Sequence, residues 1–135
     1  MFSHDTIYRV RYADTDQMGF MYYGNYARLY EIGRVEALRS LSFRYKDMED
    51  EGVLMPVYEN TSRYLQPALY DELLTIRTKI NTLPAARIVF DYEIYNAENT
   101  LIHTGKTTLV FLKKENNRLT LAPKGLLEIM KLYFE

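Results

Sequence analysis

The sequence contains no cysteine and no tryptophan. Without cysteine the chain has no disulfide, no thiolate ligand for zinc and no cysteine nucleophile, and such a composition suits a reducing compartment. No apolar run approaches the roughly 18 residues that a transmembrane helix needs. The start, from Met1 to Val10, has neither the basic nor the apolar region of a signal peptide. We therefore expect a cytoplasmic protein with no membrane span.

An excess of charge of either sign is also absent. The 17 Lys and Arg against 18 Asp and Glu leave a formal net charge of −1. No overall field therefore attracts nucleic acid or an anionic membrane, and local basic groups must hold any polyanionic ligand. Histidine is scarce, and neither His4 nor His103 has the spacing of a zinc ligand or stands near a Gly-x-Ser-x-Gly motif. The sequence thus predicts no metal site and disfavours a Ser-His-Asp hydrolase; we interpret His103 as an ordinary strand residue.

Tyrosine is the abundant residue, with 13 Tyr beside 6 Phe in 135 residues. The 47% hydrophobic and 26% charged content is ordinary for a globular protein, and the length suits one domain over 1–135. Tyrosine fits sheets and interfaces where one end of the ring is apolar and the other is wet. We expect most of these rings to pack in a sheet and a share of them to line a ligand pocket or a dimer seam.

A long helix is predicted from Tyr26 to Leu41, preceded by Asn25 as N-cap. Apolar residues recur there at three- and four-residue spacing and also occur on other faces, so the helix should be largely enclosed. Gly33 costs roughly 1 kcal/mol relative to Ala in a helix interior, which indicates a close approach to a neighbouring backbone. The pattern residues are Tyr26, Leu29, Tyr30, Gly33, Ala37 and Leu41.

Alternating and β-rich runs predict strands on both sides of this helix. Short connections between successive strands make them antiparallel neighbours, so four strands after the helix should form a meander. A helix segregated from antiparallel strands gives an α+β fold. A sheet curled around the helix would explain why the helix has apolar residues on several of its faces. The expected strands are Ile7–Tyr12, Val53–Tyr64, Leu73–Thr82, Arg87–Tyr95 and Leu101–Lys113, with brief pairing over Arg118–Leu121. The remaining segments are a loop over Ala13–Tyr22, a short helix or loop over Phe43–Gly52, and a closing helix to Phe134 with Pro123 at its first position.

The loop before the helix carries the chemistry. A helix start offers unpaired N–H groups and about half a positive charge, which suit a developing oxyanion. Gly24 would let a substrate approach this backbone closely. Asp16, on the loop just upstream, can deprotonate a water or attack a carbonyl carbon directly. Together these groups suit hydrolysis of a thioester, because a thiolate leaves without help from a strong acid.

The segment Arg11–Tyr26 resembles the signature of 4-hydroxybenzoyl-CoA thioesterase-like proteins. The matching features are the Asp-x-Asp pair, the glycine at Gly19 and the aromatic-x-Asn-Tyr entry into the helix. The stretch Tyr64–Glu72 is similar to the second landmark of the family. The resemblance implies a hotdog fold, in which an antiparallel sheet wraps one long central helix. It also implies hydrolysis of acyl-CoA without a cofactor, in a homodimer or dimer of dimers with active sites at the subunit interface.

The same resemblance assigns roles to residues. It makes Asp16 the catalytic carboxylate and the backbone N–H of Tyr23 the oxyanion donor, with Gly24 beside it. Tyr12 matches a tyrosine near the site in the branch associated with the Tol–Pal cluster, and with Gly19 it is assigned to substrate binding. That branch has a histidine where this chain has Tyr23, so no histidine assists at this position.

For further candidate residues a structural role is the alternative to a role in the site. Asp14 is interpreted as a structural residue that hydrogen-bonds the loop. Glu31 is expected to pair with Arg34, as Glu36 pairs with Arg39, although a different hotdog branch keeps its carboxylate near Glu31 and substrate contact stays open. Small polar groups in the strand that should face the site are Asn60, Thr61 and Ser62. Candidate basic groups for the CoA phosphates are Arg63, Arg87, Lys113, Lys114 and Arg118, and for each of them the alternative is a solvated charge at a strand end.

Three other functions remain open from the sequence. A thioesterase for acyl carrier protein would need a basic surface patch. A non-catalytic acyl-binding or assembly module would leave Asp16 away from any pocket. A hotdog dehydratase needs a catalytic histidine, which neither His4 nor His103 supplies in a fitting context.

Overall fold

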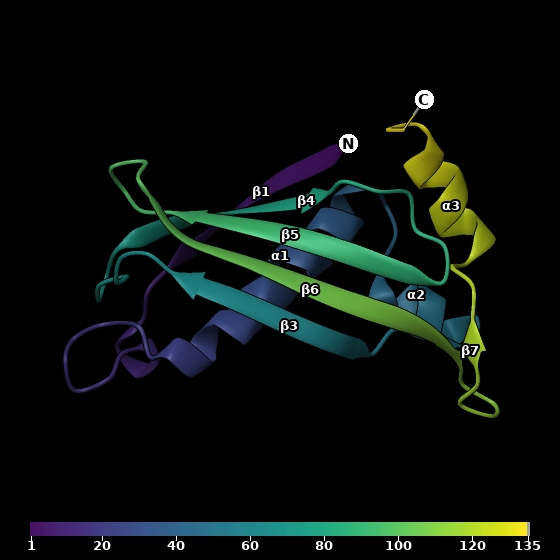
Figure 1. The fold of residues 1–135 in the computed structure, drawn as a ribbon, viewed down its shortest axis with the longest axis horizontal. Helices are drawn as coiled ribbons and strands as arrows, with labels where there is room; N and C mark the ends of the chain where they lie inside the picture. Colours follow the sequence, from purple (N-terminus) through teal and green to yellow (C-terminus); the bar gives the residue numbers. More distant parts are fainter. Residues whose placement is uncertain (135) are drawn as a thin grey trace.

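The computed structural model describes residues 1–134. One long helix, α1, lies against an antiparallel sheet, and the short helices α2 and α3 lie at one end of it (Figure 1). Two single-turn 3₁₀ helices, η1 and η2, precede α1. The helices are η1 Tyr12–Asp14, η2 Tyr23–Asn25, α1 Tyr26–Ser40, α2 Tyr45–Asp50 and α3 Lys124–Lys131. The strands are β1 Phe2–Arg9, β2 Val53–Leu54, β3 Val57–Tyr64, β4 Leu73–Ile80, β5 Arg87–Tyr95, β6 Leu101–Lys113 and β7 Leu119–Thr120.

The sheet corrects the predicted meander at one strand. Its order is β1-β4-β5-β6, with β3 on the other side of β6 and with β2 and β7 at the far end of β6. The predicted pairing of β3 with β4 is wrong because the segment 65–72 between them does not form a turn. Leu65 and Gln66 donate their amides to Ile102 O, and Leu69 forms a bridge with Phe20. This segment therefore crosses the end of the sheet and reaches the loop that carries Asp16.

Strand boundaries follow backbone chemistry. Strands β5 and β6 have the predicted bounds. The first strand begins earlier than predicted, because Phe2 pairs with Ile80 and the chain turns into η1 at Tyr12. The predicted run Val53–Tyr64 is interrupted at Pro56, which lacks the N–H that a strand ladder requires.

The predicted central helix is confirmed, and its start differs in detail. Asn25 does not cap it through its side chain; its Nδ2 donates instead to Asp14 O at 2.7 Å. Gly33 is closely packed, but against side chains of β4 rather than against the predicted backbone, since a Cβ there would lie 2.5 Å from Thr78 Oγ1 and 3.0 Å from Ile76 Cγ2. At the other end of the chain, Pro123 precedes α3 rather than filling its first position.

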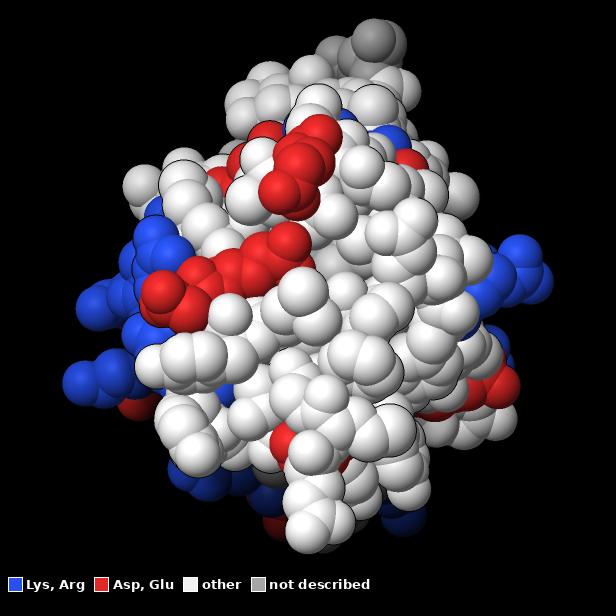
Figure 2. Space-filling view, turned by 90° about the vertical axis from the view of Figure 1, so that its left-hand side faces the viewer, with Lys and Arg blue, Asp and Glu red and all other residues white. Residues whose placement is uncertain are grey.

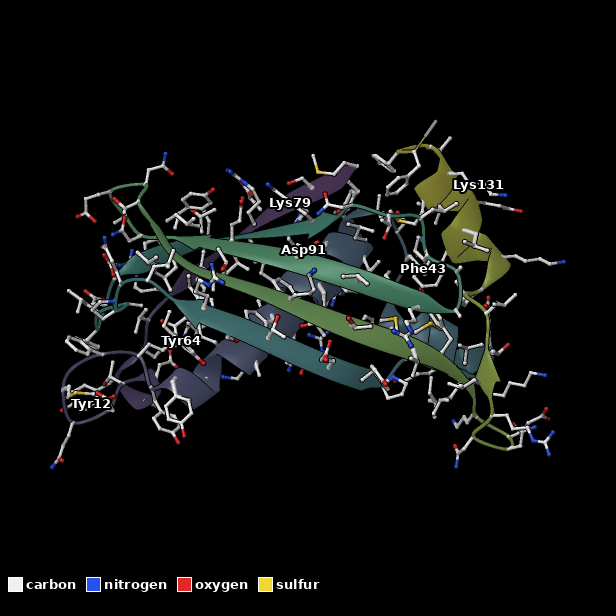
Figure 3. All side chains as sticks on the ribbon, in the orientation of Figure 1. Tyr12, Phe43, Tyr64, Lys79, Asp91 and Lys131 are labelled. Atoms are coloured by element: carbon white, nitrogen blue, oxygen red, sulfur yellow. The ribbon has the colours of Figure 1, made fainter. Side chains whose placement is uncertain are left out.

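The two faces of the sheet differ in character. Alternate residues of β4 and β5 are buried under α1 and form the core with it. The outward positions carry charge, including the Lys79–Glu93 pair at 3.0 Å and Asp91 beside Lys106 (Figure 3). None of the helices within 1–134 is long and apolar enough to cross a bilayer.

One predicted ion pair on α1 is wrong. Arg39 lies 3.4 Å from Glu36, as expected. Arg34 does not pair with Glu31, because its side chain is buried and its Nε donates to Tyr45 OH at 2.8 Å. Glu31 is left exposed on the helix.

Candidate active site

Asp14 anchors the loop that leads from β1 to α1. Its carboxylate is 4% exposed and accepts hydrogen bonds from Tyr8 OH at 2.6 Å and from Arg11 N at 2.8 Å, while Arg28 donates to the second oxygen. Burial alone would raise the pKa of Asp14, but these hydrogen bonds and the charge of Arg28 outweigh it and lower that pKa. Asp14 is thus an ionised structural residue.

The rest of the loop folds back on this anchor. Asp14 O accepts from Tyr22 N at 2.9 Å, so the residue also ties down the start of η2. Asp16 N donates to Phe20 O at 2.8 Å, and Gly19 N donates to Asp16 O at 3.1 Å. Gly19 has φ +80°, a conformation that glycine adopts without a steric cost. The turn therefore explains Gly19, whether or not it also touches a substrate.

Asp16 lies at the open side of the same loop. Its side chain is partly exposed, and Oδ1 accepts from Met18 N at 2.9 Å. Among the residues that the structure describes, Asp16 has no ion pair, and Oδ2 accepts no hydrogen bond. One oxygen is therefore held by the backbone while the other is available to a water or a carbonyl carbon.

The backbone at the entrance to α1 supplies donors beside it. The first hydrogen bond of η2 runs from Asn25 N to Tyr22 O, so the amides of Tyr23 and Gly24 precede it and have no acceptor within the helical turn. Gly24 is also closely packed against a ring, because a Cβ there would lie 2.6 Å from Cε2 of Tyr22. Its predicted closeness to a substrate stays a prediction.

A hollow of about 310 Å³ joins these groups. Asp16 and Tyr23 lie on it together, and residues from the segment after β3 form the opposite side. Its other lining residues are Met18, Phe20, Met21, Tyr26, Tyr64, Leu65, Gln66 and Pro67. Figure 2 looks onto this end of the molecule and shows an uncharged surface over its lower part, with Asp and Glu side chains above it and Lys and Arg mainly at the margins. Most of the lining is apolar or aromatic, which suits an acyl group near a single carboxylate.

A second hollow lies on the other side of Asp16. It measures about 500 Å³ and includes Tyr12, Gly19 and Tyr70. Tyr12 is 80% exposed, and its ring meets that of Tyr70 edge to face at 5.4 Å. Figure 3 shows Tyr12 and Tyr64 at the same end of the fold. Tyr12 and the predicted catalytic carboxylate of Asp16 therefore line the same hollow.

The other predicted residues line neither of these hollows. Asn60 accepts from Thr107 Oγ1 at 2.7 Å, and Ser62 Oγ lies 2.6 Å from Tyr30 OH. Thr61 and Ser62 line a separate hollow of about 360 Å³, formed with outward residues of β5 and β6. The guanidinium of Arg87 lies 5.1 Å above the ring of Tyr58. One copy of the chain does not bring Asn60, Thr61, Ser62, Arg87 or Glu31 to Asp16.

Tyrosines line the hollow of Asp16 and Tyr23, as expected of a share of them, but the sequence did not indicate Tyr64 or the layer behind Tyr26. Tyr26 and Tyr64 line the hollow, and His103 stacks on Tyr26 from behind at a ring distance of 3.9 Å. The interpretation of His103 as an ordinary strand residue is therefore incomplete. The available signal was the second landmark, which begins at Tyr64; nothing in the alternation of β6 singles out His103.

Comparisons with known proteins agree with this geometry. Residues 10–130 match the family described as the Thioesterase-like superfamily. The putative acyl-CoA thioesterase YneP of Bacillus subtilis is 37% identical over 107 residues, which cover 79% of this chain and 78% of that protein. The acyl-CoA thioester hydrolase YbgC of Escherichia coli O6:H1 is 33% identical over 123 residues, covering 91% and 92%.

A solved structure supports the same assignment. The crystal structure of DHNA-CoA thioesterase from Staphylococcus aureus superposes with a TM-score of 0.85 at 34% identity, covering 89% of this chain and 80% of that one. Shared sequence over nearly the whole chain and a shared arrangement of sheet and helix lead to one conclusion. The chain belongs to the thioesterase-like superfamily and has the hotdog fold.

Proposed function

We propose that the protein hydrolyses acyl-CoA thioesters to a free acid and CoA. The observation that carries this proposal is the hollow on which the Asp16 carboxylate and Tyr23 lie together within an apolar lining. YneP and YbgC, which are named for acyl-CoA thioesters, support the same substrate class. A reducing, CoA-containing cytoplasm is the compartment we propose, in keeping with a chain that has no cysteine.

The reaction follows from the two groups. The thioester carbonyl oxygen accepts a hydrogen bond from the Tyr23 amide, which typically contributes ~10²–10³ in rate when it stabilises an oxyanion. Oδ2 of Asp16 takes a proton from a water, whose oxygen bonds to the carbonyl carbon. The C–S bond then breaks, and CoA leaves as a thiolate. Direct attack by Asp16 followed by hydrolysis of the anhydride is the other course open to the same carboxylate.

We propose that no metal or other cofactor takes part. No group of three or more His, Asp or Glu side chains among residues 1–134 could hold a metal ion. CoA itself is part of the substrate. Turnover should therefore be unchanged after dialysis against EDTA.

A homodimer joined along β3 completes the proposal. All eight residues of β3 are exposed, and within the described chain this strand pairs on one side only, with β6. An unpaired edge of this length is a template for pairing with a second copy. Exposed aromatic residues continue from this edge to the Asp16 loop, including Tyr58, Tyr64 and Tyr23. Two dimers would make the tetramer that the family resemblance also allows.

The dimer would also bring Arg87 into play. In an antiparallel pairing of two β3 edges, the Val57 end of one strand lies beside the Tyr64 end of the other. Arg87 belongs to the Val57 end, because it pairs with Val110 and stacks over Tyr58. Arg87 of the partner subunit would then face the hollow that holds Asp16, where it could bind the phosphates of CoA. Asn60, Thr61 and Ser62 would lie along the same seam.

The deciding experiment measures free thiol released from a panel of acyl-CoA and acyl carrier protein thioesters. Hydrolysis of acyl-CoA by the wild-type chain and its loss in Asp16→Asn are expected. Activity confined to acyl carrier protein would replace the proposed substrate. The absence of hydrolysis from any thioester, with acyl-CoA still bound, would instead identify an acyl-binding module. Sedimentation showing a monomer at micromolar concentration would contradict the dimer.

A further inference from the structure

A buried histidine lies behind the aromatic side of the hollow. His103 is fully buried, and its imidazole is parallel to the Tyr26 ring, with centroids 3.9 Å apart and planes 4° apart. Tyr64 meets His103 edge to face at 4.9 Å and meets Tyr26 at 5.4 Å. Because Tyr26 and Tyr64 line the hollow and His103 does not, the imidazole forms a second layer behind the first.

Hydrogen bonds fix the plane of this imidazole. Nε2 of His103 lies 2.5 Å from Tyr30 OH, which in turn lies 2.6 Å from Ser62 Oγ. Tyr30 is itself fixed, because it stacks on Tyr92 at 4.3 Å and its hydroxyl occupies the space that a side chain at Gly105 would need. Tyr30 therefore holds the imidazole in place behind Tyr26.

The charge state of His103 suits a packing role. Burial lowers the pKa of His103 to about 4, so the ring is neutral at physiological pH. Nδ1 has no hydrogen-bond partner among the described residues, and it is enclosed by the core. A neutral ring in this setting offers a flat face for Tyr26 and no charge to a bound acyl group.

We propose that His103 is a positioning residue that sets the depth of the acyl hollow and hence the largest acyl group that binds. This inference rests on the proposed function, because it takes the hollow of about 310 Å³ as the acyl site. A dry cavity of about 150 Å³ holds one benzene ring, so a hollow of about 310 Å³ has room for an acyl group. Removing the imidazole would let the Tyr26 ring fall back and would add the vacated space to the hollow.

The test measures binding rather than turnover. Dissociation constants are determined by calorimetry for S-alkyl-CoA thioethers of increasing chain length, which cannot be hydrolysed. In His103→Ala the preference for long over short chains should rise at least ~10-fold, the change expected from burying about two further methylene groups. His103→Phe, which keeps a flat ring behind Tyr26, should retain the wild-type profile. Added imidazole should return His103→Ala towards that profile.

Control variants separate depth from general loosening of the core. Phe111→Leu removes a ring from a fully buried position near the far end of β6 and should leave the chain-length profile unchanged. If His103→Ala does not fold, His103→Asn is measured instead and should shift the profile in the same direction. An unchanged profile in the folded variant, or an equal shift in Phe111→Leu, overturns the inference.

The outcome is separate from that of the proposed function. The thioethers report the shape of the hollow even in Asp16→Asn, which is expected to be inactive. If the wild-type protein binds the thioethers but hydrolyses no thioester, the proposed function is wrong. The chain-length profile of thioether binding would still test the role of His103.

Discussion

Two aspartates stand two positions apart in the same loop and have opposite surroundings. Asp14 is 4% exposed, and Tyr8, Arg11 and Arg28 all donate to its carboxylate. Asp16 is partly exposed, and a single backbone amide, that of Met18, donates to its side chain. A carboxylate whose oxygens are all occupied can hold a loop but cannot take a proton from water. The difference teaches that the neighbours, not the residue type, leave one carboxylate bound within the loop and the other open to a ligand.

The largest effect should come from the open aspartate. Asp16→Asn keeps the size of the side chain and its bond to Met18 but removes the base, so kcat on acyl-CoA should fall by at least ~10². The melting temperature should change little, since the side chain is not buried. Thiol release and thermal unfolding are measured on the same sample. Asp50→Asn, at the end of α2, is the matched control and should keep wild-type turnover. Near-wild-type turnover in Asp16→Asn would remove this residue from the mechanism.

The closed aspartate should show the reverse pattern. Asp14→Ala leaves the Tyr8 hydroxyl and the Arg11 amide without their acceptor, so the free energy of unfolding should fall by ~2 kcal/mol. Urea unfolding measures this loss. Asp5→Ala breaks an exposed pair with Arg77 and should cost about 0.5 kcal/mol at most. Equal losses in the two variants would show that the buried network does not stabilise the loop.

The fold was largely predictable from local patterns. The enclosed helix and strands β5 and β6 follow from apolar periodicity, and that periodicity reflects burial in the finished structure. The position of β3 was not predictable from short connections, because the segment 65–72 makes backbone bonds to β6 and to the Asp16 loop instead of turning. A long connection leaves strand order to tertiary contacts that no local pattern records.

The site was predictable only in part. The motif places Asp16 and Tyr23 together, and the structure puts both on one hollow. It does not indicate that Gly24 is closely packed against the Tyr22 ring, or that His103 packs behind Tyr26. The first depends on how the backbone turns at η2, and the second on packing between α1 and β6, which are far apart in the sequence. Contacts of this kind are decided by three-dimensional packing, which is why residue-type patterns did not find them.

His103 extends the comparison, because it is buried like Asp14 but is kept neutral rather than ionised. The pKa of His103 is about 4 in the folded protein and about 6.5 in the unfolded chain, so the unfolded state binds the proton first as pH falls. Stability should therefore be full above pH 6.5 and decline below it until about pH 4, by roughly 1.4 kcal/mol at pH 5.5. Urea unfolding at pH 7.5 and 5.5 measures the decline, which should be smaller in His103→Gln. An equal decline in both proteins would show that other groups cause it.

The smallest effect should come from replacing Arg87, the predicted phosphate contact. If the dimer brings Arg87 of the partner subunit to the hollow, Arg87→Gln should raise KM for acyl-CoA about 5-fold, as expected for one solvent-accessible phosphate contact of about 1 kcal/mol. Activity on acyl-pantetheine, which lacks the nucleotide phosphates, should not change. Lys131→Gln removes an equal charge from α3, at the other end of the molecule from Tyr12 (Figure 3), and should alter neither constant. Salt screens exposed charge pairs, so the rise in KM caused by Arg87→Gln should shrink as salt is added. A rise in KM that persists at high salt would contradict the phosphate contact and indicate that packing of Arg87 on Tyr58 matters instead.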